Sequence, residues 1–145
     1  MALFGYTGVD ALMDDLRSLA GMPDSGVDGI LNAEADVVVQ AQREEIQRQW
    51  KGPHSMGISA QSIKKDNKIK RDGSGPYINV YPQGTRKRGK ERVRNAEIAF
   101  INEYGAPKRG IAARPAIKAA MRSKMEEISG AGEKVYNAYL DSKNL

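Results

Sequence analysis

The stretch AEIAFINEYGAPKRGIAARPAI, residues 96–117, decides how the second half of this 145-residue chain folds. Apolar residues recur in its first part at helical spacing: Ala96, Ala99, Phe100 and Tyr104. This spacing predicts a short helix that Asn95 caps and Gly105 ends, although alternation at positions 96, 98 and 100 also fits a strand. A turn then leads to Arg114-Pro115, which opens a new element. We interpret the stretch as a hinge between two elements.

Long helices are predicted on both sides of this hinge. Proline costs no hydrogen bond in the first turn of a helix, so Arg114-Pro115 begins a long C-terminal one, with a kink at the glycines of 129–132. Its apolar stripe is Ile117, Met121, Met125, Ile128, Val135 and Tyr139. Residues 24–51 predict a second long helix that ends at Gly52-Pro53. Its stripe is Leu31, Ala35, Val38, Ile46 and Trp50.

A further amphipathic helix is predicted near the start of the chain. Thr7 to Asp10 has the spacing of a capping box, and Gly21 ends the pattern. The apolar face of this segment is Val9, Leu12, Met13, Leu16 and Leu19. Met22-Pro23 would then form the turn into the long helix.

The middle of the chain predicts a small antiparallel sheet. Aliphatic residues and tyrosines alternate in Tyr77-Ile-Asn-Val-Tyr81, as in a strand, and Lys68-Ile-Lys-Arg71 is its expected hairpin partner. After the Pro82-Gln-Gly84 turn, the sequence TRKRGKERVRN fits either a long exposed loop or two strand tips bent around Gly89. Together these elements predict an α+β single domain over residues 1–145.

Charge is distributed unevenly along the chain. Residues 1–50 carry nine acids and three bases, a net charge of −6, whereas residues 64–94 carry eleven bases and three acids, a net charge of +8. This asymmetry predicts either a polyanionic partner or contact between copies of the chain, positive side to negative side.

The sequence favours neither an enzyme nor a metal or cofactor site. There is no cysteine, and the single histidine, His54, lies beside Gly52-Pro53 and is expected in a loop. The glycine-rich segments 73–75 and 130–132 lack the residues of a phosphate loop, and nothing pairs a nucleophile with a base. With no signal peptide and no long apolar run, we expect a soluble protein without membrane contact.

The hinge carries a family resemblance. An apolar segment ending in Glu103-Tyr104-Gly105, a short turn, and Ala113-Arg114-Pro115 opening an amphipathic helix resemble the tail-completion, or neck, proteins that join head to tail in long-tailed bacteriophages. The resemblance covers about residues 25–130, with 1–24 as a helical arm and 131–145 as the end of the last helix. Ala116 departs from it, because the family usually has a bulky aromatic residue there.

The resemblance implies a structural virion protein in the neck or tail, made in the cytoplasm of the bacterial host. It would form a ring, a hexamer favoured, and contact neighbouring neck and tail proteins. These residues, Glu103-Tyr104-Gly105 and Arg114-Pro115, would then position the turn and the helix that follows it. Gly105 would allow a left-handed cap, Arg114 would reach back to a carboxylate such as Glu103, and Pro115 would set the direction of the next helix.

The basic segment is the expected interface or lumen-facing surface of such a ring. It holds Arg86, Lys87, Arg88, Lys90, Arg92 and Arg94. Such density predicts an exposed, mobile loop that orders beside a neighbouring protein or packaged DNA, contacted without sequence specificity. The alternative function is a sequence-nonspecific nucleic-acid-binding protein that uses residues 64–94, with Tyr77 and Tyr81 for stacking. A solvated edge that discourages strand pairing would also explain these bases.

Overall fold

The computed structural model describes residues 21–52 and 57–144 of the chain. The predicted helix after Thr7 and the residue His54 lie outside the described residues. The fold is α+β, as predicted. Its elements in chain order are α2 (Asp24–Gln49), α3 (Ile58–Ser62), β1 (Ile63–Lys65), β2 (Lys70–Asp72), β3 (Gly75–Tyr77), β4 (Val80–Pro82), β5 (Thr85–Arg88), β6 (Glu91–Arg94), α4 (Asn95–Tyr104), the 3₁₀ turn η1 (Pro107–Arg109), α5 (Ala116–Ser123) and α6 (Met125–Ser142).

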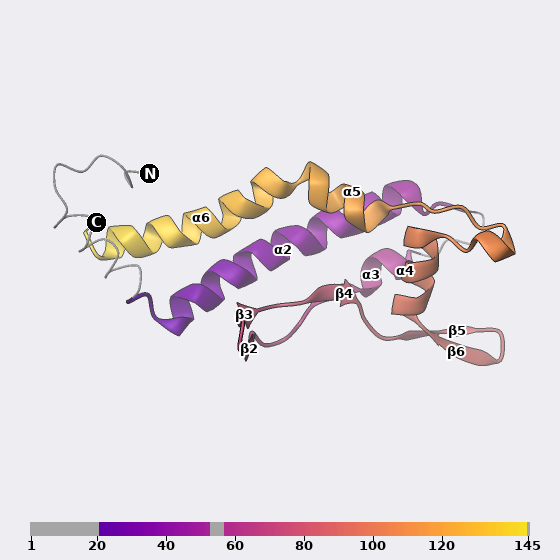
Figure 1. Cartoon of the computed structure of the whole chain (residues 1–145), viewed down its shortest axis with the longest axis horizontal. Helices are drawn as coiled ribbons and strands as arrows, with labels where there is room; N and C mark the ends of the chain where they lie inside the picture. Colours follow the sequence, from indigo (N-terminus) through magenta and orange to yellow (C-terminus); the bar gives the residue numbers. More distant parts are fainter. Residues whose placement is uncertain (1–20, 53–56, 145) are drawn as a thin grey trace.

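Two long helical segments run side by side and give the molecule its elongated shape (Figure 1). One is α2, the predicted long helix; the other is α5 followed by α6, which packs back along α2. The prediction of one continuous C-terminal helix is wrong, because the segment is divided at Lys124, which has φ −114°, and the glycines of 129–132 lie within α6. Gly132 lies buried inside α6, where a β-carbon would overlap the Glu34 carboxylate of α2. The glycine leaves room for the Glu34 side chain against α6.

The core lies at one end of this helix pair. It consists of Ile46, Trp50, Ala60, Ile63, Ala99 and Ala116, which come from α2 and its C-terminal cap, α3, β1, α4 and α5. Arg43 of α2 fixes β1 to this cluster by donating from Nη2 to the Ile63 carbonyl, 2.8 Å away. Along the rest of α2 the buried residues are Ala35, Ala41 and the polar Gln42, and Leu31 and Val38 of the predicted stripe are half-buried. Apolar burial is therefore concentrated where the short elements meet α2.

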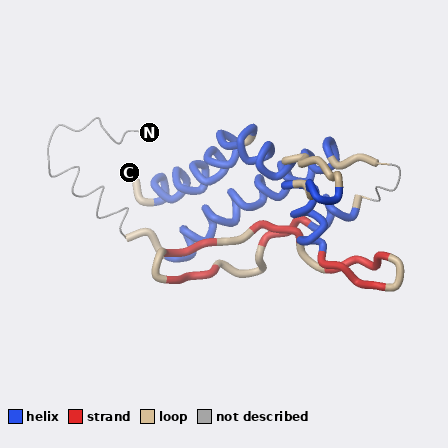
Figure 2. Tube along the Cα trace, turned by 45° about the vertical axis from the view of Figure 1, so that its right-hand side comes forward, coloured by secondary structure: helices blue, strands red, loops and turns tan. Residues whose placement is uncertain are grey.

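The predicted strand at 77–81 is two strands. β2 pairs with β3 and β1 pairs with β4, so residues 63–82 form one hairpin with an interruption (Figure 2). At the interruption, Asp66 and Asn79 face each other, and the Asp66 N–H donates to the Asn79 carbonyl at 2.9 Å. The predicted alternation is confirmed, because Tyr77 and Tyr81 are exposed while Ile78 and Val80 are half-buried.

The basic segment is a second hairpin. β5 and β6 pair in register from Thr85↔Arg94 to Arg88↔Glu91 around Gly89, which has φ +65°. The alternative with two strand tips is therefore confirmed and the unpaired loop is wrong. Figure 2 shows this hairpin projecting beyond the helices at the core end of the molecule. β6 leads directly into α4, so the hairpin is attached to the core on one side.

Glu34 provides a test of the contact between α2 and α6. Burial raises the pKa of its carboxyl above the ordinary value. A raised pKa in the folded state means that folding favours the neutral form, so the charged form destabilises the fold at neutral pH. We expect Glu34→Gln to raise the melting temperature at about pH 7.5, and the gain to shrink by about pH 4 as the wild-type carboxyl becomes protonated.

The matched control is Glu133→Gln, which changes an exposed carboxylate next to Gly132 on α6. Thermal melts at both pH values should show no comparable gain, because an exposed carboxylate has little desolvation to lose. Equal effects of the two substitutions would contradict the buried position of Glu34.

Candidate functional site

Helix α4 lies between the two features that the sequence singled out. The β5–β6 hairpin enters it at Asn95, and the hinge leaves it at Gly105. The buried side of α4 carries Asn95, Ala99 and Glu103, spaced four residues apart. The helix prediction for this stretch is therefore confirmed. Two details of it are wrong: Asn95 is the first residue of the helix and Arg94 is its N-cap, and the predicted apolar face is not the buried one. Phe100 and Tyr104 are 62% and 66% exposed and lie against each other, with ring centroids 4.8 Å apart.

The Glu103 carboxylate caps the first turn of α5. Oε2 accepts from the N–H of Ile117 at 2.9 Å, and Oε1 accepts from the N–H of Lys118 at 2.8 Å. Helix N-termini leave backbone donors without partners and carry partial positive charge, so a carboxylate is a favourable acceptor there. Glu103 is 6% exposed, so these charge-assisted bonds compensate a carboxylate that is almost fully removed from water.

The predicted contact between Arg114 and Glu103 is wrong. Arg114 donates from Nη2 to the side-chain oxygen of Asn102 at 2.6 Å, and its backbone N–H donates to the Asn102 carbonyl at 2.7 Å. The Arg114 carbonyl accepts from the indole Nε1 of Trp50 at 2.8 Å. Because helix α5 uses both Glu103 oxygens, Arg114 pairs with the preceding residue of α4 and ties it to the end of α2. We call the contacts among Trp50, Asn102, Glu103 and Arg114 the joint.

Gly105 has the predicted positive φ, with a different ψ. Its angles are φ +75° and ψ 178°, which is extended backbone with reversed φ and is essentially restricted to glycine. A β-carbon there would lie 2.7 Å from the Ala113 nitrogen and 2.8 Å from the Ile111 carbonyl oxygen. The turn closes through Ala106, which exchanges both backbone hydrogen bonds with Ile111. Pro115 has φ −73° and is the N-cap of α5, so the helix begins at Ala116, one residue later than predicted.

Arg86 differs from the other bases of the β5–β6 hairpin. It is half-buried and donates from Nε to the Asn95 side-chain oxygen at 2.8 Å and from Nη2 to the Ser59 hydroxyl at 2.9 Å. Burial, with a smaller contribution from the charge of Arg88, lowers the pKa of its guanidinium. Arg86 therefore anchors the hairpin to α3 and α4, which corrects its expected place on an exposed loop.

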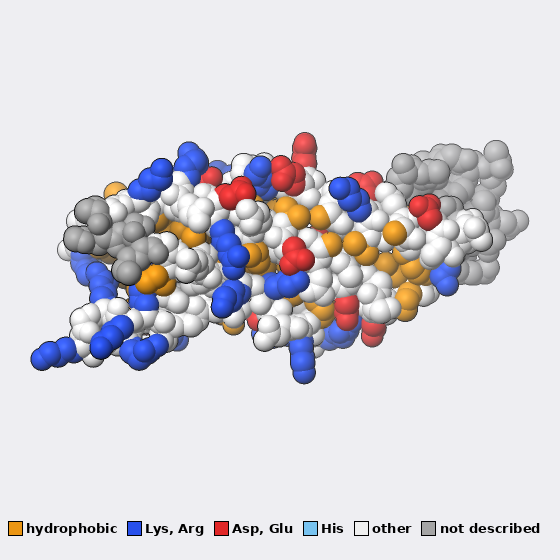
Figure 3. Space-filling view, turned by 180° about the vertical axis from the view of Figure 1, so that it is seen from behind, with side chains coloured by type: hydrophobic (Ala, Val, Ile, Leu, Met, Phe, Trp, Pro, Cys, Tyr) orange, Lys and Arg blue, Asp and Glu red, His pale blue; other side chains and the backbone are white. Residues whose placement is uncertain are grey.

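The other five bases of the hairpin are exposed. Arg92 donates to the Thr85 hydroxyl at 2.8 Å, and Arg94 pairs with Glu97 at 3.2 Å. The side chains of Lys87, Arg88 and Lys90 form no hydrogen bond or ion pair with any described residue. In the space-filling view, Lys and Arg side chains gather at this projecting end of the molecule (Figure 3). Lys87, Arg88 and Lys90 thus present cationic charge that no described carboxylate pairs with.

The bases of the longer hairpin are partly neutralised by α2. Lys65 pairs with Asp36 at 2.7 Å, and Arg71 pairs with Asp28 at 2.5 Å. Part of the charge complementarity between the acidic and basic segments is therefore satisfied within one chain. Tyr77 and Tyr81 remain exposed beside these pairs.

A cleft that the sequence did not predict lies between the β5–β6 hairpin and the core. Its volume is about 580 Å³, and its apolar lining includes Ile46, Trp50, Ala60 and Ile98. Lys51, Arg86, Lys87, Arg88 and Arg114 supply the charged part of its lining. Only the register of β5 against β6 and the packing of α4 bring these groups together, so no local pattern could have identified the cleft.

Other kinds of site find no support in the part of the chain that the structure describes. Residues 21–52 and 57–144 contain no cluster of three or more histidine, cysteine or acidic side chains that could hold a metal ion. Within the same ranges, no helix combines the length and apolarity needed to cross a membrane. Comparison of the chain with family models, curated proteins and solved structures gave no match. The joint, the hairpin and the cleft are therefore the features from which a function can be inferred.

The Glu103 cap can be tested by substitution. Glu103→Ala leaves the Ile117 and Lys118 N–H groups without their acceptor, so we expect the free energy of unfolding to fall by about 2 kcal/mol. Glu103→Gln keeps one oxygen acceptor and should lose less. Denaturant titrations measure both variants against Glu97→Ala, which removes an exposed ion pair on the same helix and should cost less than about 1 kcal/mol. A Glu103→Ala protein as stable as Glu97→Ala would contradict the cap.

Gly105 can be compared with Gly110, since both have positive φ. Gly110 has φ +69° and open space around a β-carbon, so Gly110→Ala should cost about 1 kcal/mol from backbone strain. Gly105→Val adds overlap with two backbone atoms across the turn, so we expect a loss above about 2 kcal/mol. Unfolding of both variants by denaturant gives the comparison. If Gly105→Val is no worse than Gly110→Ala, the close approach to Ala113 is wrong.

Proposed function

We propose that this chain is a structural virion protein of a tailed bacteriophage, a tail-completion or neck component that joins the head connector to the tail as a ring. The proposal rests on the resemblance of Glu103-Tyr104-Gly105 and Ala113-Arg114-Pro115 to the neck family. It assigns no reaction to the chain.

The observation that carries this proposal is the joint. The two short sequences behind the resemblance lie on either side of one turn, and they are held by the Glu103 cap and by the contact of Arg114 with Asn102 and Trp50. Such a joint fixes the angle between α4 and α5. A protein that must present a surface at a set angle in a symmetric assembly benefits from this rigidity, which supports a structural role.

The β5–β6 hairpin supports an intermolecular role for that rigid end. Lys87, Arg88 and Lys90 form no side-chain hydrogen bond or ion pair with any described residue, and exposed charges contribute little to stability. An external partner with negative charge would use them, either a neighbouring subunit, an adjacent neck protein or packaged DNA. Contact with DNA would be weak, independent of sequence and sensitive to salt.

The alternative is a sequence-nonspecific nucleic-acid-binding protein. The exposed rings of Tyr77 and Tyr81 favour it, because both can stack on bases beside a basic hairpin. The ion pairs of Lys65 and Arg71 with α2 disfavour it, since they reduce the positive charge nearest to those tyrosines. We therefore keep the neck protein as the preferred function.

Neutralising the exposed hairpin bases tests the proposal. In the variant Lys87→Gln, Arg88→Gln, Lys90→Gln and Arg92→Gln, the folded chain loses almost no internal contact, so its melting temperature should stay within about 2 °C of the parent. Joining of tails to heads, counted by electron microscopy, should fall strongly.

The control neutralises exposed bases elsewhere, by Lys68→Gln, Lys108→Gln, Lys118→Gln and Lys134→Gln. The control makes the same total charge change outside the β5–β6 hairpin, so it should join heads to tails normally. Normal joining by the hairpin variant would mean that the β5–β6 hairpin is only a solvated edge. A map of the phage particle that lacks the chain at the neck and tail would reject the proposed function.

A further inference from the structure

The cleft beside the β5–β6 hairpin combines two properties that select a particular kind of ligand. Its apolar lining includes Trp50, Ile58 and Ile98, and its volume of about 580 Å³ is enough for several large side chains. Its charged lining is all positive, and none of the described lining residues is an acid. A ligand that fills it should therefore be apolar on one side and acidic at its edge.

The arrangement of the arginines strengthens the need for an anion. Arg86 and Arg88 lie two residues apart on β5 and both line the cleft, and burial together with the charge of Arg88 lowers the pKa of the Arg86 guanidinium. Neither forms an ion pair with a described carboxylate; Arg86 has neutral partners, Asn95 and Ser59. Like charges held together at a partly buried site are unfavourable until an opposite charge arrives.

The chain contains a segment with matching chemistry. Residues 7–20 are predicted from the sequence as an amphipathic helix with a continuous apolar face, and they lie outside the described residues. This segment also carries Asp10, Asp14 and Asp15 against a single base, Arg17. The predicted helix is therefore apolar on one face and also acidic, which are the two properties that the cleft requires.

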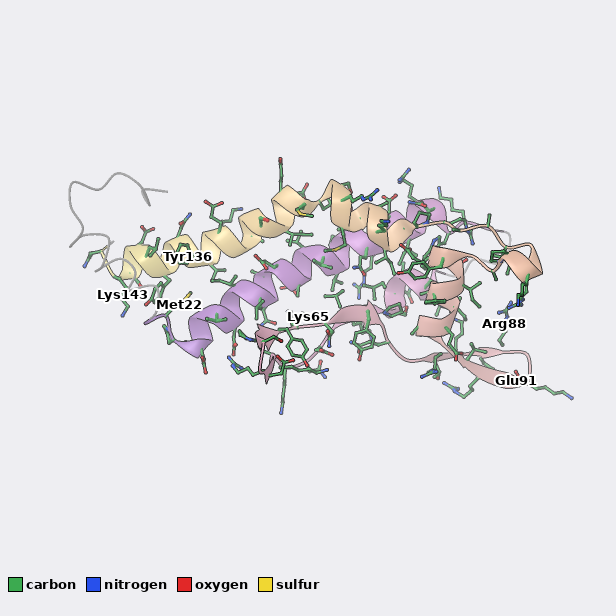
Figure 4. The ribbon with its side chains drawn as sticks, in the orientation of Figure 1. Met22, Lys65, Arg88, Glu91, Tyr136 and Lys143 are labelled. Carbon is green, nitrogen blue, oxygen red and sulfur yellow. The ribbon has the colours of Figure 1, made fainter. Side chains whose placement is uncertain are left out.

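Geometry places that segment far from the cleft of its own chain. Met22, close to the start of the described chain, lies at one end of the molecule with Tyr136 and Lys143, while Arg88 lies at the other (Figure 4). The 26 residues of α2 separate them by about 39 Å at the helical rise per residue. The helix that the sequence predicts over residues 7–19 would be about 20 Å long at the helical rise per residue, which is shorter than this distance. The matching cleft within reach is that of another copy.

We propose that the acidic amphipathic segment 7–20 of one copy docks into the basic cleft of the next copy, with its apolar face on Trp50 and Ile98 and its aspartates beside Lys87 and Arg88. This inference deepens the proposed function, because it rests on the chain forming a ring and names the contact that builds it. The contact is head-to-tail, so repetition closes a ring when the rotation at each step divides a full turn and there is no translation along the axis. Arg86 and Arg114, which line the cleft, also connect it to α4 and to the joint.

Cross-linking tests this contact directly, because the chain has no cysteine of its own. Full-length Leu16→Cys protein carrying a size tag is mixed with untagged Gln47→Cys protein and oxidised mildly; Gln47 is exposed and lines the cleft. We expect tagged–untagged disulfide dimers. The control is Gln40→Cys, also exposed on α2 but not among the residues that line the cleft, and it should give severalfold less dimer. Equal yields, or a Leu16→Cys/Gln47→Cys protein that closes its disulfide within one chain, would overturn the proposal.

Charge reversal provides the second test, on the same cysteine pair. Asp14→Lys/Asp15→Lys in the tagged chain, or Lys87→Glu/Arg88→Glu in the untagged chain, should each reduce the dimer yield by about tenfold, and combining both should restore it. Lys90→Glu/Arg92→Glu changes the charge of the same hairpin outside the cleft lining and should have little effect. If the combination does not rescue and the cleft variant instead loses binding to duplex DNA, the cleft binds phosphates and the proposal is wrong.

The outcomes separate this contact from the proposed function. If the cross-link fails but the hairpin-neutralised variant still loses head–tail joining, the chain is a neck protein whose ring forms through a different contact. A cross-link that forms in a protein absent from the neck and tail of the particle would leave the contact without that function.

Discussion

The fold depends most on the Glu103 carboxylate at the start of α5. It accepts from two backbone N–H groups at 2.8 and 2.9 Å while being almost fully buried, so the helix terminus and the carboxylate each satisfy what the other requires. Because α6 continues from α5, the direction set by this cap also determines how the last helix returns along α2. The indole N–H of Trp50 secures the same point from the α2 side through the Arg114 carbonyl.

Stability is distributed unevenly as a consequence. The joint end contains Ile63, which is completely buried, and the cluster around it. Along the helix pair, the buried positions are small residues such as Ala35 and Gly132 and the polar Gln42, which bury little apolar area. Most of the hydrophobic free energy therefore resides where α4, α5 and the end of α2 meet. The rigid end of the molecule is also the end that carries the basic hairpin and the cleft.

The charges of the chain follow the same division. Beside α2, acids neutralise the bases of the longer hairpin, as in the pairs Asp36–Lys65 and Asp28–Arg71. At the joint end, Arg86 is held by neutral groups and Arg88 has no described carboxylate partner. The charge that remains uncompensated is thus concentrated in one place, which is the pattern expected of a surface that meets an anionic partner.

The sequence alone determined the features that depend on neighbouring residues. The long helix from Asp24, the alternation around Ile78, the turn at Gly89 and the positive φ of Gly105 were all predictable, because periodicity and glycine conformations are local properties. The tertiary structure alone decided which groups from distant segments meet. It turned Phe100 and Tyr104 outward and gave Glu103 to the α5 backbone instead of Arg114. It also placed Arg86 in a cleft next to Trp50. These outcomes depend on competition among donors and acceptors separated along the chain, and no local pattern contains that information.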